Sequence, residues 1–319
     1  MAAFLRRALL SDYFVLGLCA VYAAAIAPFT PGFLSAGNWA NILAAMLPLL
    51  IVALGQTIVL ITGGIDLSVT AIIGLASIVG ALAMNEETGW LARHPLAAPI
   101  AFLLMLSVGG AVGAFNGLAI ARGRMPPFMV TLASMMGFSG LAVWLTHSKA
   151  ISALPTAFTM LGGHLAVVIG IALAVAAFSH LLLSRSLFGR WFYAVGQNPR
   201  AALISGVPVE GVVFAAYVVS GIFSALGSVL YTAQAETGSP VLGQRILLDV
   251  IGATVIGGTS LFGGKGKVLW TVFGVLFLKL VDNSLNLLSL SIFTITMAKG
   301  GVILVAACLD SLRSRLNGE

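Results

Sequence analysis

Long apolar runs recur along almost the whole chain, and they restrict its fold more than any other feature. A helix needs about 20 apolar residues to cross a hydrocarbon core of roughly 30 Å, where every backbone hydrogen bond must be satisfied within the helix. We therefore expect an all-α, polytopic transmembrane bundle with broken helices and about ten spans. These spans are residues 13–29, 40–62, 67–85, 95–121, 126–147, 164–184, 211–234, 246–262, 268–285 and 291–309.

Composition agrees with a membrane protein. Of the 319 residues, 60% are hydrophobic and 8% are charged, whereas a soluble domain has about 25% charged residues. The net charge of +6 is scattered over short segments between apolar runs, so it does not indicate nucleic-acid binding. Cys19 and Cys308 lie in apolar runs near opposite ends of the chain, so neither a disulfide framework nor a metal site is predicted. No linker divides residues 1–319, which we expect to form one transmembrane domain.

The basic residues predict the orientation of the chain in the membrane. If the N-terminus is cytoplasmic, the inner segments contain eleven of the sixteen basic residues and the outer segments contain three. Cytoplasmic loops carry an excess of Lys and Arg, so both termini are predicted to be cytoplasmic. The first span follows Arg6 and Arg7 and resembles a signal peptide, but we expect it to be retained as an anchor.

The longest cytoplasmic segment, residues 184–211, contains signals for one short helix. Asn198 is a suitable N-cap, Pro199 suits the first helical position, and Gly206 follows the expected end. About seven helical residues are marginal alone in water, so this helix needs a packing partner. It either lies against its own bundle or docks in the groove of a partner protein. In the docking interpretation Ala201, Ala202, Leu203 and Ile204 meet the partner and Arg200 lies at the rim.

Several polar residues lie inside the predicted spans, where they typically mark a pathway or a packing contact. Gln56 and Asp66 flank a break at Gly63 and Gly64, and Asp66 with Ser68 is expected to cap the next helix. Glycine pairs also interrupt residues 251–267, as in internally repeated transporters. The polar series continues through Asn116, Asp249, Asp282, Asn283 and Asn286. Lys279 and Asp282 share a helical face, where they are expected to neutralise each other.

Tests for enzymatic chemistry mostly fail. The sequence has no H-E-x-x-H, and "GGKG" at 263–266 lacks the spacing and the following Ser or Thr of a phosphate-binding P-loop. Nucleotide hydrolysis is therefore expected on another polypeptide. "GFSG" at 137–140 matches the motif of intramembrane serine proteases, with Ser139 as the nucleophile. His147, His164 and His180 are predicted to lie at other depths, so helix packing explains the motif better.

Five segments, in order, resemble the ribose/xylose/galactose-type ABC transporter permeases. They are "GQTIVLITGGIDLSV" (55–69), "NGLAIARGRMPPFMVTLASM" (116–135), "FYAVGQNPRAALISGV" (192–207), "DVIGATVIGGTSLFGGKG" (249–266) and "NSLNLL" (283–288). The resemblance implies a bacterial inner-membrane permease for a monosaccharide or related solute, working by alternating access. It implies cytoplasmic ATP-binding cassette subunits that use the ATP, a periplasmic sugar-binding protein, a second permease copy and surrounding lipid. No cofactor would be bound by this chain itself.

The resemblance also implies roles for particular residues. The ATPase-coupling set is Asn198, Pro199, Arg200, Ala201, Ala202, Leu203, Ser205 and Gly206. The expected translocation pathway comprises Gln56, Asp66, Ser68, Asn116, Ser134, Asp249, Asn283 and Asn286. Of these, Gln56, Asn116 and Ser134 are expected to serve a hydroxyl-rich solute. Thr70 and Leu247 depart from the family pattern, where glycine and glutamate are usual. The alternative is an ion-coupled secondary transporter with Asp66, Asp249 and Asp282 as coupling carboxylates.

Overall fold

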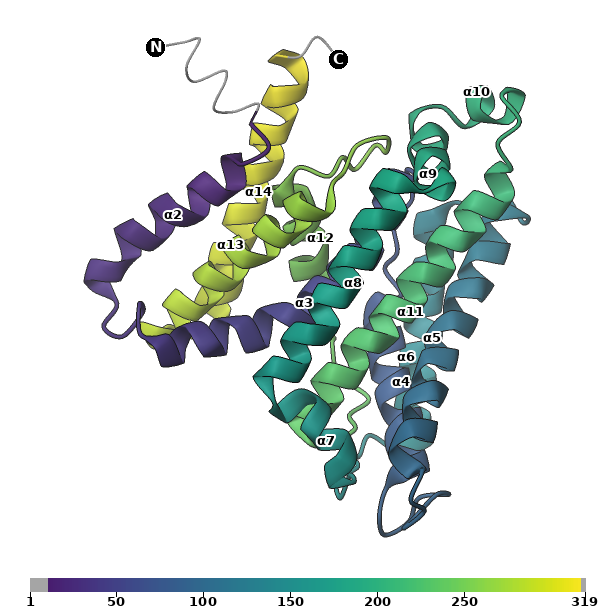
Figure 1. Cartoon of the computed structure of the whole chain (residues 1–319), viewed down its shortest axis with the longest axis vertical. Helices are drawn as coiled ribbons and strands as arrows, with labels where there is room; N and C mark the ends of the chain where they lie inside the picture. The colour runs from purple at the N-terminus through teal and green to yellow at the C-terminus, as the bar shows by residue number, and fades with distance from the viewer. Residues whose placement is uncertain (1–10, 317–319) are drawn as a thin grey trace.

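Helices form the regular structure of residues 11–316, which are the residues described by this computed structural model (Figure 1). Within these residues the only strand-like pairing is one antiparallel bridge between Ile151 and Gly238. The all-α prediction is therefore confirmed. Arg6 and Arg7, which contribute to the predicted orientation, lie outside the described residues.

Among residues 11–316, ten apolar helices overlap the ten predicted spans. Six of them are long and apolar enough to cross a membrane. These six are α3 (Ala36–Ile61), α5 (Ala97–Ala121), α6 (Pro127–Thr146), α8 (Leu165–Arg185), α11 (Val209–Ala235) and α13 (Val268–Leu287). Shorter apolar helices occur in α2 (Phe14–Ile26) with the 3-10 turn η1 (Ala27–Phe29), in α4 (Val69–Met84), in α12 (Leu247–Gly257) and in the Ile292–Val305 part of α14 (Ile292–Leu316). A count of ten complete crossings stays a prediction.

Helices α4 and α12 are short because non-helical chain precedes them. Residues 62–68 lead into α4, and residues 236–246 lead into α12. With 11 residues, α12 is about 17 Å long at 1.5 Å per residue, well below the hydrocarbon thickness. The predicted span 246–262 is therefore too long, because the helix ends at Gly257 and residues 258–267 form a loop. Each half of the chain thus contains one broken segment: residues 62–68 with α4 in the first half, and α12 with its flanking residues 236–246 and 258–267 in the second half.

Glycines allow the central helices to pack closely. A Cβ atom at Gly113 of α5 would lie 2.4 Å from the Tyr217 carbonyl of α11, and one at Gly221 of α11 would lie 2.1 Å from the Gly109 carbonyl. No side chain fits at such distances, so the backbones of α5 and α11 are in contact. Small residues serve the same purpose at helix interfaces in membranes generally. This contact fixes the position of α11 beside the break that precedes α4.

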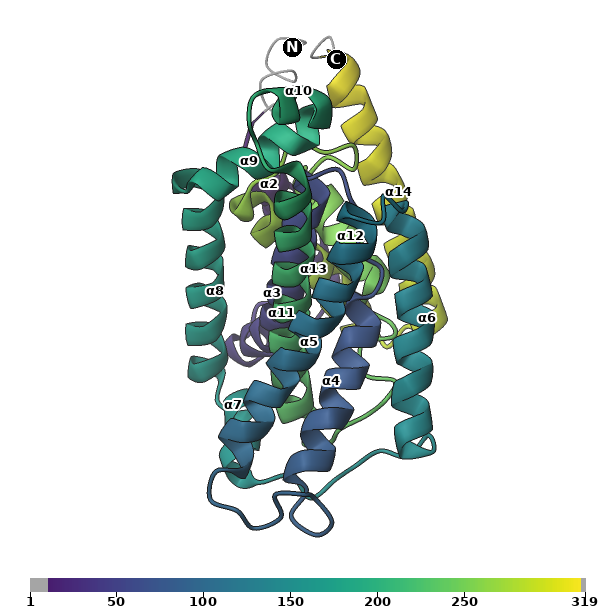
Figure 2. The same cartoon turned by 90° about the vertical axis from the view of Figure 1, so that its right-hand side faces the viewer.

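Three short helices lie at the two ends of the bundle. Helix α7 (Thr156–Gly163) is at one end, and α9 (Leu187–Gln197) and α10 (Pro199–Ile204) are at the other (Figure 1). The start of α2 and the end of α14 lie at the same end as α10 in both views (Figures 1 and 2). Following the predicted orientation, we call this end the cytoplasmic end. The prediction for residues 184–211 identified α10 but not α9, and no helix was predicted where α7 lies, between the spans 126–147 and 164–184.

Candidate functional site

The chain leaves helical geometry at the end of α3. Gly63 has a φ of +80°, which favours glycine. A Cβ atom at Gly64 would lie 2.5 Å from the Tyr217 hydroxyl oxygen, so no side chain fits there. Beyond this pair Asp66 is fully buried in the non-helical segment. The break predicted from the glycine pair is therefore confirmed.

The Asp66 carboxylate connects this segment to α11. It accepts hydrogen bonds from the Ser68 backbone N–H (3.0 Å), from the Ser68 hydroxyl (2.6 Å) and from the Ser220 hydroxyl of α11 (2.8 Å). The prediction that Asp66 and Ser68 cap the next helix is confirmed only for the position of Ser68. Helix α4 begins at Val69 with Ser68 as its N-cap residue, and no side chain bonds to its first turn. The Asp66 carboxylate oxygens instead accept hydrogen bonds from the Ser68 and Ser220 hydroxyls.

Further hydrogen bonds extend from Asp66 across three helices. With its amide turned so that the nitrogen faces the Asp66 carbonyl, the Gln56 side chain of α3 pairs with the Asp66 backbone, donating to the carbonyl (3.0 Å) and accepting from the N–H (3.3 Å). On the other side, Asn116 of α5 donates to the Ser68 hydroxyl (2.8 Å), and Ser134 of α6 donates to the Asn116 carbonyl oxygen. We call this set the Asp66 network: Gln56, Asp66, Ser68, Asn116, Ser134 and Ser220.

The Asp66 network is closed to solvent and to solute in this conformation. Every member is buried, and each makes at least one hydrogen bond within the network. Five predicted pathway residues thus meet at one place, where they join α3, α5, α6 and α11 to the broken segment. That Gln56, Asn116 and Ser134 serve a hydroxyl-rich solute stays a prediction; in this conformation their side chains bond to one another and to the Asp66 segment. Sequence reasoning missed Ser220, since serine within an apolar helix is common.

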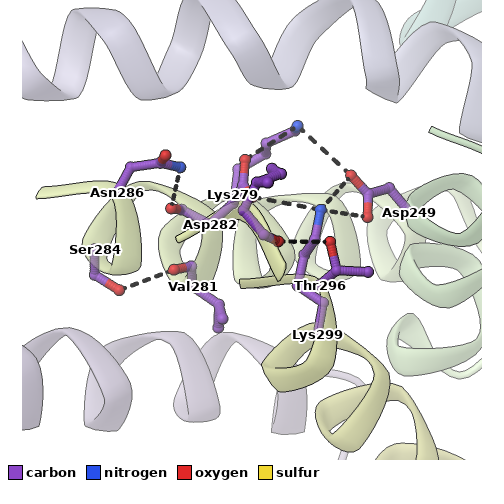
Figure 3. Close-up of polar contacts among 9 residues, drawn as sticks. Asp249, Lys279, Val281, Asp282, Ser284, Asn286, Thr296 and Lys299 are labelled. Atoms are coloured by element: carbon purple, nitrogen blue, oxygen red, sulfur yellow. Dashed lines mark hydrogen bonds and ion pairs between the residues drawn. The ribbon is translucent and has the colours of Figure 1, made fainter. Parts of the chain in front are cut away.

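Four charged residues form a second polar group between α12, α13 and α14 (Figure 3). Lys299 of α14 is 2.9 Å from one Asp249 carboxylate oxygen and 3.3 Å from Asp282. Lys279 of α13 is 3.9 Å from both carboxylates. We call Asp249, Lys279, Asp282 and Lys299 the charged cluster. With two cations and two anions, the cluster has a net formal charge of zero.

The charged cluster is less enclosed than the Asp66 network. The Asp249 side chain is 9% exposed, and the Asp282 side chain is 28% exposed. Lys279 and Asp282 do form the predicted pair, but only as part of this larger set. Sequence reasoning did not assign a role to Lys299. A signal was present, because a lysine within an apolar run is expected to require a carboxylate partner.

The remaining predicted pathway residues lie outside both groups. Asn283 of α13 and Asn38 of α3 exchange two amide hydrogen bonds of 2.9 Å. Asn286 donates to the Asp282 backbone carbonyl one turn earlier, and its side chain is exposed. Asn283 thus fastens α13 to α3, and Asn286 makes only a local contact.

Helix α10 has the predicted capping pattern. The Asn198 side chain accepts from the N–H groups of Arg200 (3.1 Å) and Ala201 (3.0 Å), and Pro199 is the first helical residue. Beyond Ser205, Gly206 has a φ of +81° and ends the helix. Six residues are helical rather than about seven.

Helix α10 presents one apolar side outward. Leu203 is 64% exposed and Ile204 is 88% exposed, whereas Ala202 packs inward and is 5% exposed. Ala202 therefore supports the helix instead of meeting a partner, and Ala201, Leu203 and Ile204 are available for contact. The packing of Ala202 agrees with a helix that lies against its own bundle. Docking of the exposed side in the groove of a partner protein stays a prediction.

The arrangement of the described residues does not favour serine-protease chemistry. These residues contain no group of three or more His, Cys, Asp or Glu residues that could hold a metal ion. Ser139 lies in α6, whereas His164 precedes α8 and His180 lies within it, and Figure 2 shows these two helices on opposite sides of the bundle. His147 is the C-cap residue of α6, two turns beyond Ser139.

Known proteins are similar to this chain along most of its length. Residues 38–307 match the family described as branched-chain amino acid transport system / permease component. The ribose import permease protein RbsC of Bacillus subtilis (strain 168) is 38% identical over 292 residues, covering 89% of this chain and 88% of that protein. The galactose/methyl galactoside import permease protein MglC of Salmonella typhimurium is 32% identical, covering 89% of each chain. No solved structure matches this chain.

Proposed function

The chain belongs to the branched-chain amino acid transport system permease family, and from this we propose that it is the membrane subunit of an ATP-driven importer for a monosaccharide or related small polar solute. The observation that carries the proposal is the 38% identity to a ribose import permease along 89% of the chain. Another relative, 32% identical, is named for galactose. The family description refers to amino acids, so the proposal follows these similar proteins in the choice of solute.

The proposed motor is a separate ATP-binding cassette subunit at the cytoplasmic end. Support comes from α10, whose Leu203 and Ile204 are exposed at that end beside the capping residue Asn198. An exposed apolar side on a short, capped helix fits the groove of a partner protein. ATP binding would move α10, and the bundle would open in turn to each side of the membrane. This chain would bind no cofactor itself.

The proposed assembly contains a second permease copy and a periplasmic sugar-binding protein in a bacterial inner membrane. Support for a second copy comes from Gly137 and Gly140 of α6 and from Gly300 and Gly301 of α14. A Cβ atom at any of these glycines would meet nothing within 4 Å. Open glycines on a membrane helix allow another helix to approach closely. The solute would pass between the two copies.

The charged cluster is the polar group best suited to line part of the proposed pathway. Asp249 and Asp282 can accept hydrogen bonds from sugar hydroxyls, and Lys279 and Lys299 can donate to them. Because the four charges sum to zero, the cluster would not select for a charged solute. The Asp66 network is closed in this conformation, so its proposed role is to hold the broken segment in place.

Transport by purified components tests the proposal. The permease, its ATP-binding subunit and its binding protein would be reconstituted in lipid vesicles with labelled ribose, galactose or leucine. We expect uptake of a sugar that requires ATP and all three proteins. Uptake of leucine but not of either sugar would reject the solute assignment while leaving the transport mechanism standing.

The alternative is an ion-coupled secondary transporter. Under that alternative Asp66, Asp249 and Asp282 would bind the coupling ion. The Asp66 carboxylate is buried and accepts hydrogen bonds from serine hydroxyls, and Asp249 and Asp282 are paired with lysines, which speaks against binding of a coupling cation. An ionophore that collapses proton and sodium gradients discriminates the two mechanisms. Uptake by the permease alone that stops with the gradient would reject the ATP-driven proposal.

A further inference from the structure

Three segments that are distant in the sequence meet through their backbones at the cytoplasmic end. They are the end of α3, the end of α9 and the loop of residues 258–267. The Gly264 N–H donates to the Ile61 carbonyl (2.9 Å). A Cβ atom at Gly196 would lie 1.8 Å from the Ile61 carbonyl oxygen and 2.6 Å from the Gly264 nitrogen. A Cβ atom at Gly263 would lie 2.8 Å from the Gly196 carbonyl oxygen. We call Ile61, Gly196, Gly263 and Gly264 the glycine junction.

A fourth contact holds the same segments together. The Tyr193 hydroxyl of α9 donates to the Gly266 carbonyl of the loop (2.7 Å). Burial raises the pKa of Tyr193, so its hydroxyl keeps the proton that it donates. The last turn of α9 is thus attached to the 258–267 loop at Tyr193 and at Gly196.

The glycine junction lies between the proposed motor contact and both broken segments. On one side, Gly196 is followed by Gln197 and then by Asn198, the N-cap of α10. On another side, Ile61 ends α3 and leads directly into the segment that carries Asp66. The loop begins where α12 ends, at Gly257. A displacement of α10 therefore has a short covalent and contact path to each broken segment.

Contact between backbones transmits movement with little loss. A contact made by a long side chain can yield by a change of rotamer, whereas two peptide groups in contact can only move together. The close approach requires glycine at position 196, because a Cβ atom there would overlap the Ile61 carbonyl oxygen. A methyl group there would require the end of α3 or the loop to shift.

We propose that Gly196 is a positioning residue for transport: it brings the backbone of α9 into contact with α3 and the 258–267 loop, so that movement of α10 reaches both broken segments. This inference rests on the proposed function, because it assumes that a motor subunit moves α10. Gly196 belongs neither to the proposed solute pathway nor to the proposed motor contact. Its substitution should therefore separate ATP hydrolysis from transport.

The test measures solute molecules carried per ATP hydrolysed by the reconstituted complex of permease, ATP-binding subunit and binding protein. The variant is Gly196→Ala. The matched control is Gly211→Ala, at the start of α11, where a Cβ atom would meet only Pro208 at 4.0 Å. We expect Gly196→Ala to retain the ATP-binding subunit and its hydrolysis rate while the transport ratio falls about five-fold or more. The control should keep the wild-type ratio.

A milder variant keeps the inference testable if Gly196→Ala does not assemble. Tyr193→Phe removes only the hydrogen bond to Gly266, and we expect an unchanged thermal midpoint with a ratio lowered about two-fold. Assembled Gly196→Ala with the wild-type ratio would overturn the inference. If only Tyr193→Phe assembles, a transport ratio equal to that of the wild type in this variant would overturn the inference. A wild-type complex without ATP-dependent sugar uptake would instead reject the proposed function, so the two failures are distinguishable.

Discussion

The Asp66 network and the charged cluster both place polar side chains among apolar helices, but they compensate buried charge in different ways. Around Asp66 the donors are serine hydroxyls and a backbone N–H, and every side chain is buried. In the charged cluster two lysines face two aspartates, and Asp282 remains partly exposed. The first arrangement depends on hydrogen bonds to one carboxylate, and the second depends on charge balance among four groups.

This difference matters because hydroxyl groups adapt and charged groups do not. A serine hydroxyl can donate or accept, so the Asp66 network can reorganise around an altered residue. An ammonium group can only donate, and removing it leaves carboxylates without a counter-charge. The charged cluster should therefore tolerate single substitutions poorly and paired substitutions better. The following predictions test that contrast.

Removing one charge from the cluster should have the largest effect. Lys299→Met keeps the length of the side chain but leaves Asp249 and Asp282 with Lys279 alone, at 3.9 Å from each. Loss of one partner from an enclosed ion pair typically destabilises by about 3 kcal/mol. Denaturation of the purified permease in detergent measures this cost. Stability equal to that of the wild type would show that Lys299 contributes little to the balance.

Removing one charge of each sign should recover part of that loss. The double variant Asp249→Asn, Lys299→Met leaves Lys279 and Asp282 as one neutral pair. We expect it to be about 1–2 kcal/mol more stable than Lys299→Met alone, within the range of coupling energies for residues in contact. The same denaturation series, with both single variants, completes the cycle. Additive costs would mean that the two residues do not interact.

Replacing the carboxylate of the Asp66 network should cost less. In Asp66→Asn one side-chain oxygen still accepts from Ser68, and the new amide can donate to the Ser220 hydroxyl. We expect a loss of about 1 kcal/mol, the net value of a single hydrogen bond. Asp66→Leu keeps the branching and the number of side-chain heavy atoms without polar atoms, and serves as the contrasting variant, with a larger loss. If Asp66→Asn cost as much as Lys299→Met, hydroxyl adaptation would be the wrong account.

The smallest effect is expected next to the charged cluster. Asn286→Ala removes an exposed side chain whose only described hydrogen bond is to the Asp282 backbone carbonyl one turn earlier. We expect its stability to stay within about 0.5 kcal/mol of the wild type, as for most surface substitutions. A larger change in stability would mean that Asn286 also contributes to the charged cluster.

The positions of the apolar helices could be predicted because membrane thickness sets their length. The break before α4 was also predictable, since Gly63 and Gly64 interrupt an apolar run. The partners of Ser220 and Lys299 could not be predicted, because helical periodicity does not say which helices become neighbours. Helix α9 was missed because its apolar side chains lie in a segment too short and too mixed to read as a span. Its Gly196 is informative only once the Ile61 carbonyl is known to lie beside it.

The zero sum of the charged cluster has an electrical consequence. A cell's transmembrane voltage does work on any net charge that moves across the membrane, at about 2.3 kcal/mol per elementary charge per 100 mV. Two ammonium and two carboxylate groups that travel together experience almost no such force. Rearrangements of α12, α13 and α14 that keep the four groups together should therefore proceed at the same rate in energised and de-energised cells.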